Sequence, residues 1–303
     1  MVARMIRERL LPILTVVLGI LVIWYAAAVL LNSSWTRDQA ARAGMSLSLS
    51  QTLVDTMTQE RPKLPAPHQV AAEFWKLTWT EEVGGRRGIV QSGSLSNRGL
   101  LHHVLATASA TVLGFVFGAG FGVLLAIGIT HNRAMDMSVM PWAIASQTVP
   151  IVAIAPMIIV VLNSLGISGL VPKAIIAAYL SFFPVAVGMV KGLRSPDQMQ
   201  LDQLRTWNAT GGQVLWKLRL PASLPYLFAS LKVGIAASLV GTIVAELPIG
   251  GAGLGTRLLA GSYYGQTIQI WATLLAAALL ASAMVGAVGW LQGRTLKRMG
   301  FAR

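Results

Sequence analysis

The chain has 303 residues, of which 54% are hydrophobic and only 12% charged; it carries a formal net charge of +13 and contains no cysteine. This composition excludes an ordinary soluble globular protein, and the lack of cysteine excludes disulfides and thiolate metal sites. Most of the basic residues flank apolar runs that are long enough to cross a bilayer, so the positive charge indicates a lipid bilayer rather than a nucleic acid as partner.

The first apolar run, residues 10–31, follows three arginines in the first nine residues. A signal peptide is the alternative, because Ala26–Ala28 resembles a cleavage site. The run is, however, longer than the usual signal core of about 7–15 residues. We therefore predict that residues 1–31 hold a cytoplasmic N-terminus and a retained first transmembrane helix, in agreement with the positive-inside rule.

Residues 32–99 are polar and mixed in charge, which predicts a periplasmic segment. Leu64–Pro67 (LPAP) predicts a stiff, extended entry. Residues 68–79 are amphipathic and predict a short helix at the membrane interface. Residues 81–99 are rich in Gly and Ser and are expected to be flexible.

Five more apolar runs predict five further spans, at residues 101–129, 140–162, 171–190, 225–247 and 266–290. The second span carries small residues at four-residue spacing, which let another helix approach closely in lipid: Ala106, Ala110, Gly114, Gly118, Gly122 and Ala126. The expected fold class is all-α, a polytopic membrane protein with six transmembrane helices. Lys and Arg are concentrated in the short segments on one side, which places both termini in the cytoplasm.

The third span contains Pro150 and Pro156. Prolines within a span free backbone carbonyls, which is tolerated where the helix faces protein or a water-filled path, and transporters use such broken helices in their substrate route. A plain kink is the alternative, and the sequence does not decide between them. Gln147, Pro150 and Pro156 are therefore candidate path residues.

Glu246 ends the fifth span and is the only acidic residue after Asp202. An acid near membrane depth is a functional candidate by default; the alternative is a carboxylate that caps loop amides. A glycine-rich run follows and contains Gly253 and Gly255, which join Glu246 as candidate path residues. This run is not a nucleotide-binding loop, because no Gly-Lys-Ser/Thr sequence occurs in it.

Residues 195–221 form the longest polar interruption in the last two thirds of the chain. Capping sequences at Ser195–Gln198 and Thr210–Gln213 predict two short helices of about 12 and 8 residues. Asn208 lies between them and predicts a left-handed turn that stops the first helix. Pro221 is expected to end the second helix.

This stretch resembles the cytoplasmic EAA loop of permease subunits in binding-protein-dependent ABC importers, whose pattern is E-A-A-x3-G-x9-I-x-L-P. With Leu220-Pro221 aligned, Asp202 stands at the position of Glu and Asn208 at that of Gly. Gln203 and Leu204 stand at the positions of the two alanines, and Leu218 stands at that of Ile. By this resemblance the loop docks on an ATPase subunit, and the coupling residues are Asp202, Leu204, Arg205, Trp207, Asn208, Gly211, Leu218, Leu220 and Pro221.

The resemblance covers about residues 64–298 and is closest to the nitrate/sulfonate/taurine branch of these permeases. It implies a type I importer-like core of five helices over 100–303, located in the bacterial inner (cytoplasmic) membrane. The implied partners are a second permease copy, in a homodimer rather than a heterodimer, a pair of ATP-binding subunits and a periplasmic substrate-binding protein. The implied solute is a sulfonate, a nitrate-like anion or a small N-heterocycle such as a pyrimidine. ATP and Mg are expected on the partner ATPase, with no cofactor in this chain.

The residues themselves show no catalytic constellation, so the chain is not expected to be an enzyme. A self-contained channel or secondary carrier for a small solute is the alternative function, and a membrane scaffold is a third. Acids are scarce in the predicted spans, whereas ion-coupled carriers usually need intramembrane carboxylates. The scarcity favours a transporter that is powered by another chain.

Overall fold

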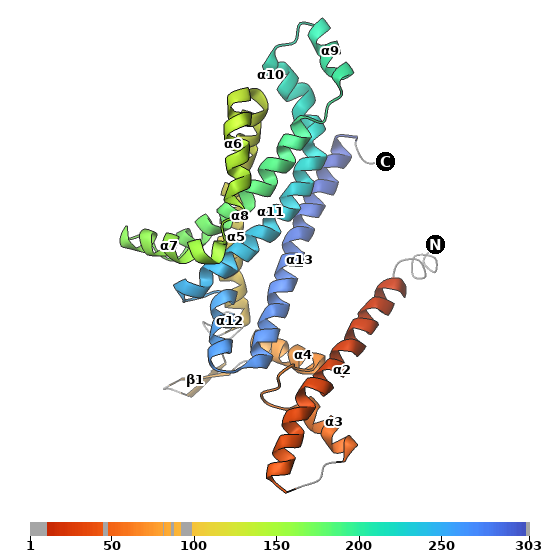
Figure 1. Cartoon of the computed structure of the whole chain (residues 1–303), viewed down its shortest axis with the longest axis vertical. Coiled ribbons are helices and arrows are strands. Elements are labelled where there is room, and N and C mark those ends of the chain that lie inside the picture. The colour runs from red at the N-terminus through yellow and green to blue at the C-terminus, as the bar shows by residue number, and fades with distance from the viewer. Residues whose placement is uncertain (1–10, 45–47, 81, 86–87, 92–98, 301–303) are drawn as a thin grey trace. The chain divides into compact units, whose positions relative to one another are not determined.

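The computed structural model describes residues 11–44, 48–80, 82–85, 88–91 and 99–300. The chain forms two compact units: one combines residues 1–101 with 257–276, and the other combines 102–256 with 277–303. The described residues are mostly helical (Figure 1), as the sequence predicts. One antiparallel hairpin, β1 (Glu82–Gly85) and β2 (Gly88–Gln91), lies in the stretch that was expected to be flexible.

The N-terminal part of the first unit consists of α2 (Leu11–Arg42), α3 (Leu49–Thr58), α4 (Pro67–Trp75) and a π-turn, η2 (Lys76–Thr80). Helix α2 continues well past residue 31, where the first span was expected to end. Residues 32–42 contain neither Gly nor Pro, so nothing in their sequence stops the helix. Gly44, with φ +66°, follows its end. The interfacial helix expected over 68–79 is formed by α4 and η2.

One buried asparagine holds the connection between α3 and α4 against α2. The amide of Asn32 is fully buried; its Nδ2 donates to Leu64 O at 2.9 Å and its Oδ1 accepts the Leu64 N–H at 3.2 Å. One turn later Thr36 Oγ1 donates to Asp55 Oδ2 at 2.7 Å. Buried polar groups stabilise a structure only when they are bonded in this way, so these contacts fix the three helices as one set.

The remaining helices are α5 (Leu100–His131), α6 (Arg133–Ser146), α7 (Ile151–Ser164), α8 (Leu170–Leu193), α9 (Gln198–Thr206), α10 (Gly211–Val214), the π-turn η3 (Leu215–Arg219), α11 (Leu220–Ile249), α12 (Leu254–Tyr263) and α13 (Thr267–Arg298). Among the described residues, five stretches are long and apolar enough to cross a membrane: α2, α5, α8, the continuous run Gly211–Ile249, and α13. These correspond to five of the six predicted spans.

The third predicted span, 140–162, is not one helix. It is divided between α6 and α7, whose axes differ by 98° across the break at residues 147–150. Pro150 is the N-cap of α7, and because proline lacks an N–H and clashes with the preceding turn, α6 cannot continue through it. Pro156 lies inside α7 without ending it. The sequence identified the proline at the break. Counting the bent pair as one broken span gives up to six spans among the described residues, so the predicted number of six stays a prediction.

Helix α5 packs on α8 through the row of small residues that the sequence predicted. A Cβ placed on Gly114 would lie 2.5 Å from Ala174 O, and one on Gly122 would lie 2.6 Å from Phe182 O. Backbones approach this closely only where no side chain intervenes. The second unit is therefore held together by close contact between helix backbones as well as by large side chains.

Gly118 and Gly120 allow a matched test of this packing. Gly118→Ala would place a Cβ 2.5 Å from Ala178 O, whereas a Cβ at Gly120 meets no atom within 4 Å. We expect Gly118→Ala to destabilise the protein by about 1–3 kcal/mol, because the facing backbone has to move. We expect Gly120→Ala to be neutral or slightly stabilising, since Ala favours a helix.

Thermal unfolding in detergent measures both variants. Equal melting temperatures for Gly118→Ala and Gly120→Ala would contradict the packing of α5 on α8.

Candidate functional site

The first candidate site is the polar helix pair over residues 198–219, formed by α9 and by α10 with its continuation η3. We call this segment the helix pair α9–α10. Helix α9 begins with a capping box at Asp197, whose side chain accepts the Gln198 N–H at 2.7 Å while Gln200 Oε1 accepts the Asp197 N–H at 3.1 Å. The predicted cap at Ser195 is wrong, because that hydroxyl donates to Gly192 O at 2.7 Å at the end of α8. Helix α9 therefore has 9 residues, fewer than expected.

The second capping box and the turn between the helices are confirmed. Thr210 and Gln213 form the box, with the Thr210 N–H donating to Gln213 Oε1 at 2.8 Å. Asn208 has φ +54° and is the only non-glycine among the described residues with a positive φ. The Ala209 N–H bonds Leu204 O at 3.0 Å, which closes α9 in a Schellman motif. This geometry explains why Asn stands at the position where the importer loop has Gly.

Helix α10 does not end at Pro221, contrary to the sequence prediction. It passes through the π-turn η3 directly into α11, and the Leu220 N–H bonds Leu215 O, five residues back. Pro221 falls in the first turn of α11, directly after the π-turn, whose wider i→i−5 spacing accommodates the proline within the helical run. Residues 211–249 therefore form one continuous helical run.

One cluster attaches the helix pair to the helices beneath it, and an ion pair joins two of those helices to each other. Leu215 is buried in a cluster with Ile129 of α5 and Met189 of α8, and half-buried Leu220 packs against this cluster. At the end of α8, Arg194 forms an ion pair with Asp136 of α6 at 2.8 Å. Because the base of α10 is buried among other helices, displacement of the helix pair would be transmitted to them.

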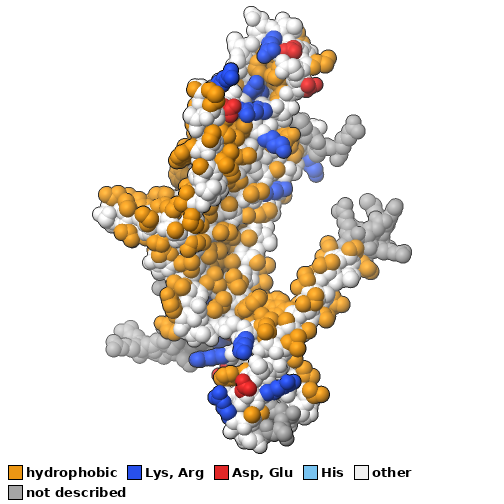
Figure 2. All heavy atoms as spheres, in the orientation of Figure 1, with side chains coloured by type: hydrophobic (Ala, Val, Ile, Leu, Met, Phe, Trp, Pro, Cys, Tyr) orange, Lys and Arg blue, Asp and Glu red, His pale blue; other side chains and the backbone are white. Residues whose placement is uncertain are grey.

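The opposite face of the helix pair is exposed and carries large apolar side chains. Met199, Trp207 and Trp216 are 80%, 68% and 72% exposed. Tryptophans in such positions are typical centres of protein interfaces. Basic side chains gather around this end of the second unit (Figure 2).

The other predicted coupling residues lie around these apolar side chains. Asp202 and Arg205 form an exposed ion pair at 2.8 Å. Leu204 and Leu218 are half-buried, and Gly211 is exposed with no atom within 4 Å of a Cβ placed on it. The structure therefore brings the predicted coupling residues together in one segment; their role in coupling stays a prediction.

The second candidate site surrounds Glu246, whose side chain is completely buried. Thr107 Oγ1 of α5 lies 2.9 and 3.0 Å from the two carboxylate oxygens, and the Gly255 N–H donates to Oε2 at 2.9 Å. Lys173 Nζ of α8 lies 3.6 Å from Oε1 and donates to Ala252 O at 2.7 Å. A buried carboxylate needs such partners, and these come from α5, α8 and the first turn of α12 (Leu254–Tyr263).

Gly253 and Gly255 are required at this site for steric reasons. A Cβ on Gly253 would overlap the carboxyl group of Glu246, and one on Gly255 would overlap the carbonyl of Ile243. The φ of Gly253 is +157°, which also disfavours a side chain. Both glycines therefore let the loop approach the carboxylate closely, an arrangement that matches the capping alternative for Glu246.

The sequence did not identify the polar partners of Glu246. Thr107 both donates to Glu246 and accepts the Leu254 N–H at 2.9 Å. One turn further into the span, Thr111 Oγ1 donates to Thr242 Oγ1 at 3.0 Å. The available signal was the four-residue spacing of Thr107 and Thr111 on α5 and of Thr242 and Glu246 on α11, which places each pair on one helix face.

Two of the other candidate path residues, Gln147 and Pro150, lie at the bend between α6 and α7, and the third, Pro156, lies inside α7. Gln147, Pro150 and Pro156 are exposed and make no hydrogen bond to Glu246. Helix α7 packs against α8 and α11 through a cluster that includes Ile159 and Ala245. The six candidates thus fall into two groups on adjoining helices, and their role in transport stays a prediction.

Thr107→Val tests the hydrogen bonds around Glu246. The substitution leaves the Leu254 N–H and one carboxylate contact without a partner, so we expect a loss of about 2 kcal/mol in stability. Thr130→Val is the matched control on the same helix, because the Thr130 hydroxyl bonds only Ala126 O of α5.

Unfolding of both variants in detergent provides the measurement. A melting temperature for Thr107→Val as high as that for Thr130→Val would show that Glu246 does not depend on this contact.

Comparison with known proteins agrees with this architecture. The riboflavin transport system permease protein RibX of Chloroflexus aurantiacus is 29% identical over 229 residues, covering 76% of this chain and 78% of the relative. The putative aliphatic sulfonates transport permease protein SsuC of Bacillus subtilis is 25% identical over 234 residues, covering 77% of each chain. A crystal structure of an amino acid ABC transporter with histidines shares the fold, with a TM-score of 0.53 and 16% identity over 66% of this chain and 93% of that one.

The family model for the binding-protein-dependent transport system inner membrane component matches residues 118–300. This match extends over more than half of the chain and includes the helix pair α9–α10 and the Glu246 site. The chain therefore belongs to the family of inner membrane components of binding-protein-dependent transport systems.

Proposed function

We propose that this chain is the permease subunit of an ATP-driven importer and that it forms the membrane path for a small solute delivered by a periplasmic binding protein. The observation that carries the proposal is the helix pair α9–α10. It exposes Trp207 and Trp216 on one side and is buried at Leu215 on the other. Amphipathic helices of this kind dock into grooves of partner proteins. The ATPase is the proposed partner, and ATP and Mg would be bound there.

The continuous run from Gly211 to Ile249 supplies a physical route for coupling. Its first residues belong to the proposed ATPase contact, and Glu246 near its other end contacts α5, α8 and the first turn of α12. A rigid-body displacement of α10 by the ATPase would therefore act on the opposite end of the bundle. Interfaces that shift between discrete arrangements amplify small displacements of this type.

The proposed orientation places the helix pair α9–α10 and both termini in the cytoplasm. Support comes from Arg194, Lys217 and Arg219, which lie at the ends of the membrane-spanning helices on the α9–α10 side, as the positive-inside rule requires. A second copy of this chain completes the proposed path, since permeases of this type act in pairs by the family resemblance.

Two solute classes remain as candidates, an N-heterocycle and a sulfonate-type or nitrate-like anion. RibX is named for riboflavin and SsuC for aliphatic sulfonates. Lys173 does not argue for an anion, because its ammonium group contacts Glu246 and Ala252. Binding measurements with the cognate binding protein, using riboflavin and an alkanesulfonate as competing probes, distinguish the two classes.

A self-contained secondary carrier has less support. Among the described residues Glu246 is the only buried acid. It already interacts with Lys173 and Thr107, whereas ion-coupled carriers use intramembrane carboxylates as ion ligands. Uptake by the purified chain in liposomes without an ATPase and ATP would overturn the proposed function.

Substitutions of Asn208 test the coupling role of the turn between α9 and α10. Asn208→Gly should keep both ATPase binding and solute-stimulated ATP hydrolysis, because Gly adopts φ +54° without strain. Asn208→Val should weaken ATPase association by about tenfold, since a β-branched residue strongly disfavours this conformation.

Co-purification with the ATPase and hydrolysis in liposomes are the measurements. Insertion into the membrane should be equal for the two variants. Normal coupling by Asn208→Val would contradict the assignment of α9–α10 as the contact.

A further inference from the structure

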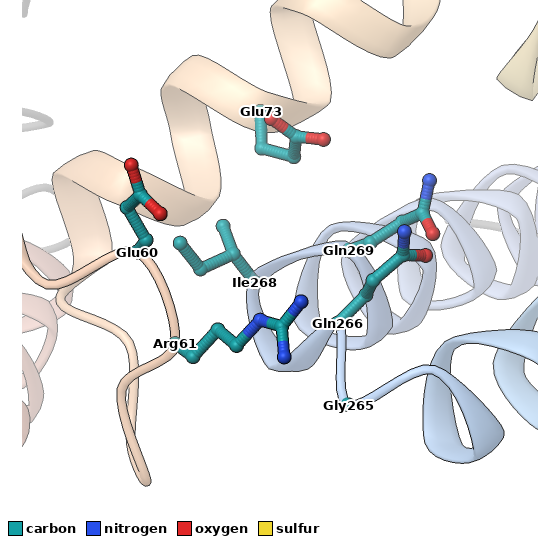
Figure 3. Close-up of a pocket in the computed structure, with 7 residues that line it drawn as sticks. All are labelled: Glu60, Arg61, Glu73, Gly265, Gln266, Ile268 and Gln269. Carbon is teal, nitrogen blue, oxygen red and sulfur yellow. The ribbon is translucent and has the colours of Figure 1, made fainter.

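The first unit contains a polar hollow that has no part in the coupling or path assignments. Its volume is about 260 Å³, and it lies between the α3–α4 connection and the turn from α12 to α13. Figure 3 shows Glu60, Arg61 and Glu73 on one side and Gln266 and Gln269 on the other, with the Arg61 side chain extending toward Gln266. We call these five residues the outer socket.

The charged groups of the outer socket are not used by the fold. Within the described part of the chain, the side chains of Glu60, Arg61 and Glu73 form no hydrogen bond or ion pair. Glu60 and Arg61 are exposed and Glu73 is half-buried, so water solvates these charges and the fold does not use them. All three line one hollow and are accessible to a molecule from outside.

The outer socket is held in shape by bonds around Gln59, the residue that precedes it. Gln59 Nε2 donates to Thr36 Oγ1 at 2.8 Å, and Gln59 O accepts from Gln69 Nε2 at 3.0 Å. Trp24 Nε1 of α2 donates to Pro65 O at 3.0 Å. A site that is ordered before binding loses less entropy when a partner arrives.

The lining indicates a protein partner rather than a small solute. Small-molecule sites enclose most of the ligand and are lined mainly by apolar groups, whereas Glu60, Arg61 and Gln266 are exposed to solvent. Charges of both signs on an exposed surface instead guide association and select the partner. The complementary surface would present a basic side chain to the two glutamates and an acidic one to Arg61.

We propose that the outer socket is a docking site for the solute-binding protein that serves this permease. The inference rests on the proposed function, because the proposed orientation places the α3–α4 connection on the periplasmic side. Three of the five socket residues, Glu60, Arg61 and Glu73, precede the family match at 118–300. The socket therefore gives this chain a means of recognising its own binding protein that the matched region does not provide.

Arg61→Glu tests the socket in the reconstituted transporter complex, with the cognate solute-binding protein as the probe. We expect the concentration of binding protein for half-maximal stimulation of ATP hydrolysis to rise about tenfold, because the substitution sets like charges against the partner. The maximal and unstimulated rates should stay unchanged. In the unaltered complex this concentration should also rise with salt, since exposed charges are screened.

Lys63→Glu is the matched control, because Lys63 is exposed two residues further on and does not line the socket. An equal effect of both variants, or none from Arg61→Glu, would overturn the socket while leaving the proposed function intact. An Arg61→Glu defect in binding of free solute without the binding protein would overturn it in favour of a solute site. Absence of any stimulation of the unaltered complex by the binding protein would overturn the proposed function as well.

Discussion

The buried carboxylate of Glu246 imposes the strongest constraint on the second unit. Removing a carboxylate from water is costly unless charge and hydrogen bonds replace the lost hydration. Thr107 supplies a hydroxyl from α5, Lys173 an ammonium group from α8, and Gly255 an amide from the first turn of α12. This one side chain thus links α11 to three other helices. The glycines of α5 complete the arrangement by letting α8 approach along the rest of the interface.

The helical run Gly211–Ile249 connects this constraint to the exposed helix pair. At one end the turn at Asn208 positions α9 beside α10, and at the other end Glu246 bonds the neighbouring helices. The π-turn between Leu215 and Arg219 lets the helix pass Pro221 without interruption. The family match and the continuous helix are two separate observations. Both favour a mechanism in which a partner protein that binds α9–α10 drives the movement of the helix bundle.

Local signals in the sequence predicted a large part of this structure. Five spans, the small-residue row of α5 and the left-handed turn at Asn208 follow from composition, spacing and intrinsic backbone preference. Three features did not follow from these signals. Ser195 bonds Gly192 O at the end of α8, because Asp197 two residues later takes the cap of α9. Helices α6 and α7 meet at 98°, an angle that a proline alone does not set. Lys173 pairs with Glu246, a partner from a distant part of the chain that periodicity does not reveal.

The central claim is that the ATPase contacts the permease through α9 and α10. Hydrogen–deuterium exchange of the permease, alone and in complex with its ATPase, measures this contact directly. The account predicts that amides in residues 198–219 exchange about tenfold more slowly in the complex, because docking suppresses local opening, while those of α3 and α4 stay unchanged. Equal exchange of residues 198–219 in both states, with protection elsewhere on the chain, would contradict it.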